Sequence, residues 1–256
     1  MATNAVMPNP KSAHALLVVA KHPTPGQTKT RLTPPLSPGQ AAALYACFLR
    51  DILDLARQVP QVQPVIAYLP PQAGGYFARL APNYERIPQE GTDLGARLDN
   101  ALARYFRLGY RRVVIMNSDS PTLPLACLVG AFEALSGEAD VALGPCDDGG
   151  YYLIGLKRPA PRLLREVRMS TPHVLADTLA LAAEEGLRAA LLPAWYDVDD
   201  AASLARLSAE LAQAPLEIAR HTRAFLERQD PKGLPWPGRP APLDLRRRGR
   251  PAVPHP

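Results

Sequence analysis

The sequence of 256 residues contains little cysteine, only Cys47, Cys127 and Cys146. Three cysteines without CxxC or Cys/His spacing argue against a disulfide framework or a zinc site, and they indicate idle thiols in a reducing compartment. No run approaches the roughly 18 apolar residues that suggest a membrane-spanning helix. Pro8 and Pro10 interrupt the amino-terminal region, which lacks the layout of a signal peptide. These absences predict a soluble cytoplasmic protein that does not act at a membrane.

A strong charge of one sign is also absent from most of the chain. The whole sequence has a net charge of +5, and residues 230–256 contribute +4 of it through six basic and two acidic residues. The other 229 residues hold 23 basic and 22 acidic side chains. This balance argues against a nucleic-acid-binding protein, whose basic residues would cover a folded face. Residues 1–13 and the Pro- and Arg-rich segment 230–256 are predicted to be disordered, which leaves one folded domain over 14–229.

Strand-like and helix-like patterns alternate through the first half of the chain. Apolar runs typical of strands cover 14–20, 64–69 and 112–116, and helical spacing covers 38–59, 72–80 and 91–108. Ser37 is the expected N-cap of the first long helix, with Pro38 at its first position. The alternation predicts a doubly wound sheet with right-handed crossovers, and a ligand at the carboxyl ends of its strands.

The pattern changes after Leu135. The apolar runs 140–144 and 151–156 are separated by only six residues. Six residues are too few for a crossover helix, so these strands are expected to be antiparallel neighbours or parts of a mixed sheet. A helix over 172–185, a strand over 187–192 and helices over 201–213 and 216–228 complete the expected elements. The fold class is therefore α/β, with a mixed, mostly parallel sheet flanked by helices.

A basic loop follows the first strand. It carries Lys21, Lys29 and Arg31, and Pro25 and Gly26 restrict its backbone. Backbone amides and cationic side chains at the carboxyl edge of a first strand form a cradle for a phosphorylated ligand. A basic surface loop without a ligand is the alternative.

Acidic residues follow the later strands. Asp119 comes directly after the 112–116 strand, where a carboxylate either caps the next helix or binds Mg²⁺ or Mn²⁺ together with waters and substrate phosphates. Just past the last strand, Asp199 or Asp197 could complete that metal site, whereas Asp200 is in the position of an N-cap. All these loops are expected at the same sheet edge as the basic loop.

A second acidic turn reads Asp147-Asp148-Gly149-Gly150 and leads into Tyr151. Asp-Gly-Gly is a common hairpin turn, so structure alone could account for it. The alternative is a binding turn, because paired carboxylates suit acceptor or sugar hydroxyls and glycines let a ligand approach the backbone. Thr171 either faces the same pocket or serves the start of the following helix.

These motifs, in this order, resemble the DUF2064 group of the nucleotide-diphospho-sugar transferase (GT-A fold) superfamily, a group also described as selenodomain-associated or arsenosugar-biosynthesis glycosyltransferases. The matching segments are 21–32, 89–97, 118–124, 147–156 and 197–199, within a resemblance that covers about 14–228. The resemblance implies a GT-A-like, Rossmann-like catalytic domain. It also implies a nucleotide whose diphosphate is bridged to Asp119 by Mg²⁺ or Mn²⁺, with Asp199 at the position of a second metal-binding carboxylate.

The resemblance assigns roles to further residues. The implied nucleotide-binding residues are Lys21, Pro25, Gly26, Lys29, Gln89, Gly91, Leu94 and Gly95. The chemistry of the loops, apart from the resemblance, makes Lys29, Arg31 and Asp148 the candidate catalytic residues and Asp147, Gly149, Gly150, Tyr151 and Thr171 the candidate substrate-binding residues. The first loop departs from the G-x-G-x-R pattern of sugar-nucleotide pyrophosphorylases and is closer to the Lys-x-Arg-Leu loop of guanylyltransferases that activate phospholactate-type acids. Asp119 stands in Ser-Asp-Ser, where many glycosyltransferases have Asp-x-Asp.

Three functions are compatible with these residues. The first is glycosyl transfer from a nucleotide sugar to a small acceptor, with a metal as Lewis acid and Asp148 orienting or deprotonating the acceptor hydroxyl. The second is nucleotidyl transfer, in which a phosphate- or carboxylate-bearing substrate attacks an NTP and pyrophosphate leaves. The third is a nucleotide-binding protein without catalysis. Glycosyl transfer is the expected function.

Overall fold

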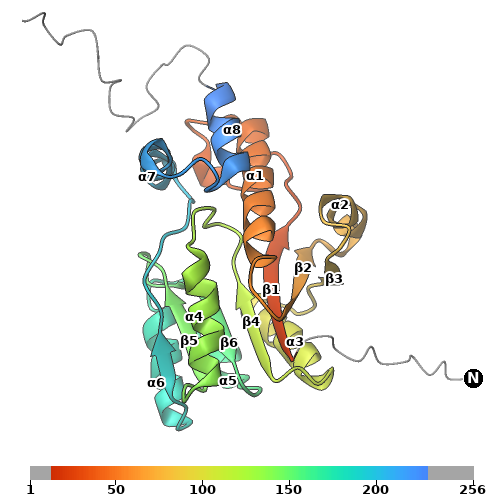
Figure 1. Cartoon of the computed structure of the whole chain (residues 1–256), viewed down its shortest axis with the longest axis vertical. Coiled ribbons are helices and arrows are strands. Elements are labelled where there is room, and N and C mark those ends of the chain that lie inside the picture. The colour runs from red at the N-terminus through yellow and green to blue at the C-terminus, as the bar shows by residue number, and fades with distance from the viewer. Residues whose placement is uncertain (1–12, 230–256) are drawn as a thin grey trace, which may run out of the picture.

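A seven-stranded sheet runs through residues 13–229, the part of the chain that the computed structural model describes (Figure 1). The strands are β1 (His14–Lys21), β2 (Val62–Leu69), β3 (Glu85–Pro88), β4 (Arg112–Met116), β5 (Val141–Pro145), β6 (Tyr151–Leu156) and β7 (Ala189–Leu191). Their order in the sheet is β3-β2-β1-β4-β6-β5-β7. β6 is antiparallel to β4 and β5, and the other neighbours are parallel. The segments 1–12 and 230–256, which the sequence predicts to be disordered, lie outside the described residues.

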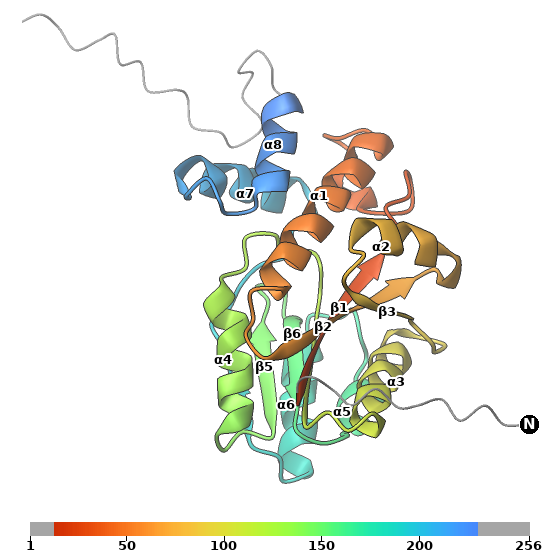
Figure 2. The same ribbon diagram turned by 45° about the vertical axis from the view of Figure 1, so that its right-hand side comes forward.

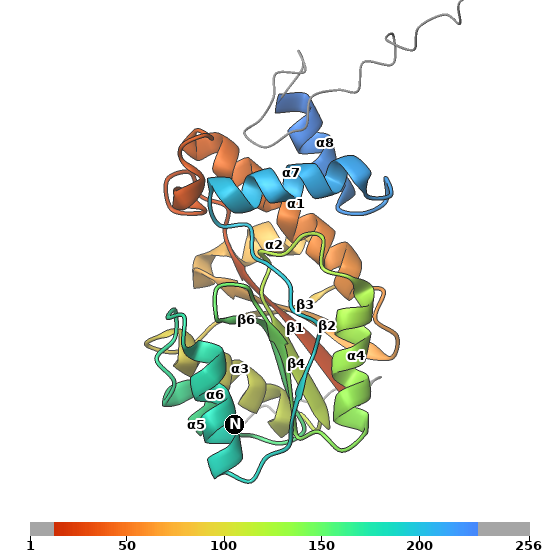
Figure 3. The ribbon, with the colours of Figure 1, turned by 90° about the vertical axis from the view of Figure 1, so that its left-hand side faces the viewer.

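Helices cover both faces of this sheet. They are α1 (Pro38–Ala56), α2 (Gly74–Leu80), α3 (Leu94–Arg107), α4 (Leu125–Ser136), α5 (Arg162–Arg165), α6 (Val174–Glu184), α7 (Ala201–Gln213) and α8 (Arg220–Gln229), with short 3₁₀ helices η1 (Thr30–Leu32) and η2 (Pro71–Ala73). Figure 3 shows α4 on one side of the sheet and α3, α5 and α6 on the other. No helix in this part of the chain is long and apolar enough to cross a bilayer.

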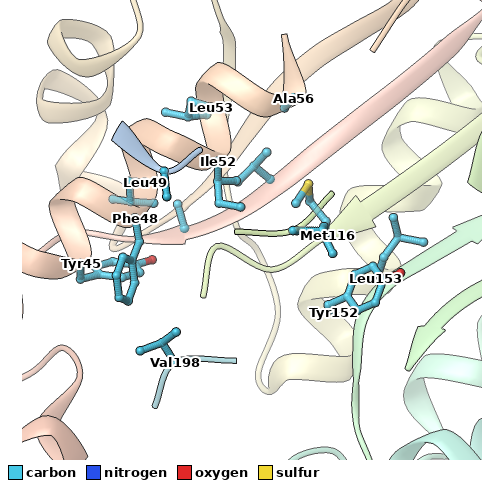
Figure 4. Close-up of a cluster of buried hydrophobic side chains, with 14 of the residues drawn as sticks. Tyr45, Phe48, Leu49, Ile52, Leu53, Ala56, Met116, Tyr152, Leu153 and Val198 are labelled. Carbon is cyan, nitrogen blue, oxygen red and sulfur yellow. The ribbon is translucent and has the colours of Figure 1, made fainter. Parts of the chain in front are cut away.

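Strand alternation divides the core into two layers. Leu17 points into the layer covered by α3 and α6, and the next residue, Val18, points into the layer under α1 and α4. Both side chains are fully buried. The second layer joins α1 to residues near the carboxyl edge of the sheet, among them Met116, Tyr152 and Val198 (Figure 4). The carboxyl edge of the sheet, where the ligand is expected to bind, is therefore supported by a packed hydrophobic core.

The long helix α1 begins as predicted. The backbone N–H of Gln40 donates to Ser37 Oγ at 3.3 Å, and the Gln40 side chain accepts from the Ser37 N–H at 2.8 Å. This capping box satisfies two backbone donors at the helix start, and Pro38 occupies the first turn, where its missing N–H costs nothing. The buried face of α1 then packs on β1 and on α8.

The other expected elements are present, with shifted ends. The antiparallel pairing of β5 and β6 is confirmed, and α7 covers the expected residues. α8 begins at Arg220, whereas the sequence predicted a start at 216, and Leu216 is highly exposed in the preceding loop. β3 and α5 were not predicted from the sequence. Each has only four residues, which is too short for a clear hydrophobic period.

The carboxyl-terminal helices lie at one end of the molecule. α7 and α8 pack beside α1, away from α6 and α5 (Figures 1 and 2). The segment between β7 and α7 runs back along the sheet to reach them (Figure 3). This path carries Asp197 and Asp199 past the loop that follows β4.

Candidate active site

A pocket of about 760 Å³ lies at the carboxyl ends of β1 and β4 and the amino end of β6. Its lining comes from the loop after β1, the loop after β4, the turn before β6, the loop before α6 and the segment before α7. β1 and β4 are parallel neighbours, so the loops that follow them lie at the same edge of the sheet. The predicted location of the ligand site and the observed pocket therefore coincide.

Lys29 is at the centre of the charged end of this pocket. Its ammonium nitrogen lies 2.6 Å from Asp119 Oδ1 and 2.6 Å from Asp199 Oδ1. The guanidinium of Arg31 contacts the other oxygen of Asp199, also at 2.6 Å. The Lys29 side chain is only 5% exposed, while the two carboxylates are about one-third exposed. Two cations and two carboxylates from three distant loops thus form one cluster that opens to the pocket.

The backbone of the first loop directs Lys29 inward. Lys29 has a left-handed conformation with φ of 53° at the start of η1, and its carbonyl accepts the N–H of Leu32 at 3.0 Å. Leu32 is fully buried and anchors η1 in the core. On the other side, Thr28 Oγ1 donates to the His22 carbonyl at 3.1 Å and accepts the Thr24 N–H at 3.2 Å. A positive φ at a non-glycine residue has a cost, so the surrounding contacts must hold it.

The rings of two aromatic residues of α1 lie near the ammonium of Lys29. The ammonium lies 5.8 Å from the ring centroid of Tyr45 and 5.9 Å from that of Phe48. The hydroxyl of Ser118 donates to the Val19 carbonyl at 2.8 Å, so the Tyr45 hydroxyl donates to Ser118 Oγ and accepts the Lys21 N–H. Burial, and then the negative charge of Asp119, raises the pKa of Tyr45. This neutral phenol links β1 to the loop after β4.

Asp197, the alternative metal-site candidate, lines the pocket and links its walls through hydrogen bonds. Its Oδ1 accepts from Asn117 Nδ2 and Ser120 Oγ, both at 2.7 Å, and from the Cys146 thiol at 3.4 Å. Burial, and then repulsion from Asp119, raises the pKa of Asp197. One residue later, the Val198 N–H donates to the Asp119 carbonyl at 2.9 Å. These bonds fix the two metal-site candidates, Asp119 and Asp199, side by side.

Burial and ion pairing shift the pKa values of Lys29 and Asp199 in opposite directions. Burial disfavours the charged ammonium of Lys29, but Asp119 and Asp199 outweigh it, so the pKa of Lys29 is raised. Burial likewise disfavours the carboxylate of Asp199, but Lys29 and then Arg31 outweigh it and lower the pKa of Asp199. At neutral pH both members of this pair are charged.

The two carboxylates of the turn before β6 lie in different surroundings. Asp148 lines the pocket and accepts the Gly150 N–H at 2.9 Å, whereas Asp147 points to Arg206 of α7 at 2.5 Å. Gly149 has φ of +86°, and a Cβ there would lie 2.1 Å from the Pro172 carbonyl oxygen. Its own carbonyl accepts the N–H of residue 175 at 3.0 Å. The turn and the loop before α6 therefore form one unit of the pocket wall.

The motif over 89–95 contributes less to the pocket than expected. Leu94 lines it, but the Gln89 side chain is buried and donates to the Ala67 carbonyl at 2.8 Å. Gly91 has φ of +147° and is crowded by the first turn of α3. A Cβ at Gly95 would lie 2.0 Å from the Leu164 carbonyl oxygen. These residues have structural reasons to be present.

The structure brings most of the predicted site residues together. Those that line the pocket are Lys21, Lys29, Arg31, Leu94, Asp119, Asp148, Gly150, Tyr151, Thr171 and Asp199. Those outside its lining are Pro25, Gly26, Gln89, Gly91, Gly95, Asp147 and Gly149. Sequence reasoning missed Tyr45, Ser118 and Asn117. The last two directly precede Asp119 in the sequence, but nothing in the helical pattern of α1 distinguishes Tyr45 from a core residue.

The residues present fit a hard divalent cation. Asp119 and Asp199 already direct one oxygen each at a single positive centre, the ammonium of Lys29. Mg²⁺ and Mn²⁺ need only one or two protein carboxylates when phosphates and waters supply the other oxygens. Among residues 13–229 no three His, Cys, Asp or Glu side chains converge as a metal site. The pair can therefore supply only part of a cation's oxygen shell, and waters or a diphosphate would supply the rest.

Comparison with known families and structures gives a consistent result. The model of a family described as "Uncharacterized protein conserved in bacteria (DUF2064)" matches residues 52–171. A crystal structure of a "putative nucleotide-diphospho-sugar transferase" from Desulfovibrio desulfuricans G20 is 32% identical, with a TM-score of 0.80, over 86% of this chain and 96% of that chain. No curated protein matches the sequence.

Two more distant structures share the fold alone. One is CMP:2-keto-3-deoxy-manno-octonic acid synthetase complexed with CTP, which is 13% identical with a TM-score of 0.50 over 78% of this chain and 98% of that chain. The other is a cytidylyltransferase from Leptospira borgpetersenii serovar Hardjo-bovis (strain JB197), which is 14% identical with a TM-score of 0.51. The match covers 86% of this chain and 95% of that chain. The α/β fold expected from the sequence is thus the fold of nucleotide-sugar transferases and cytidylyltransferases.

Proposed function

The chain belongs to the DUF2064 family, and we propose that it is a divalent-cation-dependent glycosyltransferase that moves a sugar from a nucleotide-diphosphate sugar to a small neutral acceptor. The observation that carries this proposal is the convergence of Lys29, Asp119 and Asp199 within hydrogen-bonding distance at the sheet edge. A diphosphate is the ligand that needs both cationic side chains and carboxylates that hold a metal. The similarity to a nucleotide-diphospho-sugar transferase supports the same donor.

Residues at one end of the pocket would bind the donor, and residues at the other end would bind and activate the acceptor. At the charged end, Lys29 and Arg31 would stabilise the negative charge that develops on the departing nucleoside diphosphate. Asp119 and Asp199 would hold Mg²⁺ or Mn²⁺, which when bound supplies Lewis-acid stabilisation of the same leaving group. At the other end, Asp148 would accept the proton of the attacking hydroxyl, since it lines the pocket and no ion pair engages its carboxylate within residues 13–229.

The acceptor end favours a neutral molecule. On the side formed by the turn before β6 and the loop before α6, the pocket is lined by Asp148, Gly150, Tyr151, Met169, Ser170, Thr171, Pro172 and Val174. None of these lining residues is a lysine, arginine or histidine. A phosphate- or carboxylate-bearing acceptor would meet the Asp148 carboxylate there without a compensating cation, which disfavours it. The hydroxyls of Ser170 and Thr171 in this lining suit an alcohol or a sugar.

Nucleotidyl transfer is the second candidate, and the two cations of the first loop favour it. Lys29 and Arg31 lie together at the donor end, where both could steady a triphosphate. In that reaction the same carboxylates would hold the metal while a substrate oxygen attacks the α-phosphate. The two functions therefore differ in the donor and in the product released.

Product analysis separates the two candidates. The purified protein would be incubated with Mn²⁺ and either a panel of UDP- and GDP-sugars or the four NTPs, each with neutral and anionic acceptors. Glycosyl transfer releases a nucleoside diphosphate from the sugar donors, and chelation of the metal should abolish that release. Pyrophosphate release from an NTP, with no reaction of any nucleotide sugar, would replace the first proposal by the second. Nucleotide binding without turnover of either donor class, unchanged in Asp119→Asn, would contradict both.

A further inference from the structure

The ammonium of Lys29 occupies the place between Asp119 and Asp199 that a metal would need. Its nitrogen is 2.6 Å from one oxygen of each carboxylate. Mg²⁺ held by the same two oxygens would lie about 2.0–2.1 Å from them, within the space that the ammonium occupies. Two positive centres cannot share that position, because their mutual repulsion is strongest at such short separations.

The geometry points to Lys29 as a resident counter-cation that a divalent metal must displace, and that moves to the diphosphate when metal and nucleotide bind together. This inference rests on the proposed nucleotide–metal site and adds an order to its assembly. Without ligands, Lys29 keeps the two carboxylates neutralised. With a diphosphate present, phosphate oxygens offer the ammonium a new partner and leave the carboxylates to the metal.

The surroundings of Lys29 allow such a movement of the ammonium alone. The backbone is held, because Thr28 and Leu32 on either side are buried and the Lys29 carbonyl accepts the Leu32 N–H. The ammonium lies 5.8 Å and 5.9 Å from the ring centroids of Tyr45 and Phe48, and these cation–π contacts are less directional than hydrogen bonds. A lysine side chain has rotatable bonds that can turn the ammonium while its Cα stays in place. The carboxylates are open to the pocket on the side from which a ligand arrives.

The inference distinguishes Lys29 from Arg31. Among residues 13–229, the Arg31 guanidinium is ion-paired with Asp199 alone, and its side chain is 69% exposed. It can remain at the rim while a metal binds between the carboxylates, because it touches the outer oxygen, Oδ2. Loss of Lys29 should therefore increase the metal affinity of the ligand-free protein more strongly than loss of Arg31.

Metal binding to the free protein tests this directly. Mn²⁺ affinity would be measured by electron paramagnetic resonance of the unbound ion, without nucleotide, for the wild type, Lys29→Met, Arg31→Met and Lys157→Met. Methionine keeps an apolar side chain near Tyr45 and Phe48. Lys157→Met removes the same charge at an exposed lysine whose ammonium donates to the Gly137 carbonyl, away from the site. The expected result is an affinity at least about tenfold higher in Lys29→Met than in the wild type and in Lys157→Met, a difference of about 1.4 kcal/mol.

Thermal unfolding gives a second readout if the variant is unstable. A metal that replaces the ammonium should stabilise Lys29→Met more than the wild type at the same Mn²⁺ concentration, because stabilisation follows the ratio of metal concentration to Kd. Folding of Lys29→Met that depends on Mn²⁺ also supports displacement. Failure of this variant to fold even with excess Mn²⁺, or an unchanged or weaker Mn²⁺ affinity, overturns the inference.

A separate titration tests the function on which the inference rests. Inorganic pyrophosphate would serve as a probe of the diphosphate site, titrated calorimetrically into the wild type with saturating Mn²⁺. If pyrophosphate binds but Lys29→Met leaves the Mn²⁺ affinity unchanged, only the displacement by metal is wrong. If pyrophosphate does not bind and no variant binds Mn²⁺, the proposed nucleotide–metal site fails, and the inference fails with it.

Discussion

The ammonium of Lys29 lies 2.6 Å from the carboxylate of Asp199, although 170 positions separate the two residues in the chain. Two features of the fold produce this contact. β1 lies in the middle of the sheet, next to β4, so the loop that carries Lys29 begins at the centre of the carboxyl edge. The segment after β7 then returns along the sheet and is joined to the loop after β4 by the Val198 N–H and the Asp119 carbonyl.

The two carboxylates of the turn before β6 should differ in their effect on transfer. Asp148→Asn is expected to lower kcat by about 10²–10⁴-fold with little change in KM, because it removes the proposed general base. Asp147→Asn is expected to cause a loss below about tenfold, since Asp147 pairs with Arg206 outside the pocket lining. Steady-state kinetics with the donor that the product analysis identifies would measure both. Equal losses in the two variants would contradict the role of Asp148.

Gly149 is expected to be intolerant of any side chain. A Cβ there would lie 2.1 Å from the Pro172 carbonyl, so Gly149→Ala must displace the loop before α6 as well as strain a backbone at φ of +86°. Gly109→Ala is the matched control, because Gly109 has φ of +91° but open space around its Cβ position. The control should lose about 1 kcal/mol of unfolding free energy, and Gly149→Ala about 1–3 kcal/mol more. Urea unfolding measures this difference. Similar losses would show that the contact with Pro172 is unimportant.

The position of α8 depends on a buried carboxylate of α1. Asp51 accepts the backbone N–H groups of His221 and Thr222, each at 2.9 Å, and the Thr222 hydroxyl at 2.6 Å. Burial raises the pKa of Asp51, while these donors favour the charged form. Asp51→Ala leaves buried donors without a partner and should cost about 1–3 kcal/mol of unfolding free energy.

Asp54→Ala serves as the control for Asp51→Ala. Asp54 contacts Arg220 and His221 at a more exposed position of the same helix. Its loss should cost at most about 1 kcal/mol, as for other surface ion pairs. Equilibrium unfolding of the two variants tests the comparison, and a larger loss for Asp54→Ala would contradict the assigned role of Asp51.

Mild acid should destabilise the start of β1. Arg112 Nη1 lies 3.2 Å from His14 Nε2, and because arginine only donates, this nitrogen accepts. Burial, and then the charge of Arg112, lowers the pKa of His14 from its ordinary value of 6.5. The unfolded chain therefore binds the proton more readily than the folded one, and the unfolding free energy should fall as the pH drops below about 6.5.

The variant His14→Gln isolates this contribution. Its unfolding free energy, measured in urea between about pH 5 and pH 8, should vary less with pH than that of the wild type. An identical pH dependence of His14→Gln and the wild type would exclude His14 as the source.

Local sequence patterns predicted the elements that are stabilised mainly by local contacts and the strands that are fully buried. The capping box at Ser37 and Gln40 and the apolar run of β4 are visible in the sequence and are present in the fold. β3 was missed because its four residues include Glu85 and Pro88, and its pairing with β2 depends on a neighbour distant in sequence. The start of α8 was misplaced because Asp51, on another helix, satisfies its first N–H groups.

The site was predictable as a set of loops but not as a set of contacts. Lys29 and Asp119 follow buried strands, and the order of strands in an α/β sheet places such loops at one edge. Gln89 follows β3 in the same way, yet its side chain turns into the sheet and donates to Ala67. Side-chain direction depends on the few ångströms around each residue, and sequence spacing does not contain that information.

Taken alone, the amino-acid sequence determined the α/β class, the long helices and the residue types available at the carboxyl edge, because hydrophobic period, capping and strand-end loops are local properties. Only the tertiary structure decided that Lys29 lies between Asp119 and Asp199, that Asp148 faces the pocket while Asp147 faces Arg206, and that Asp197 holds the walls together. Charges interact over a few ångströms, so their pairing depends on how distant segments pack and not on their distance along the chain.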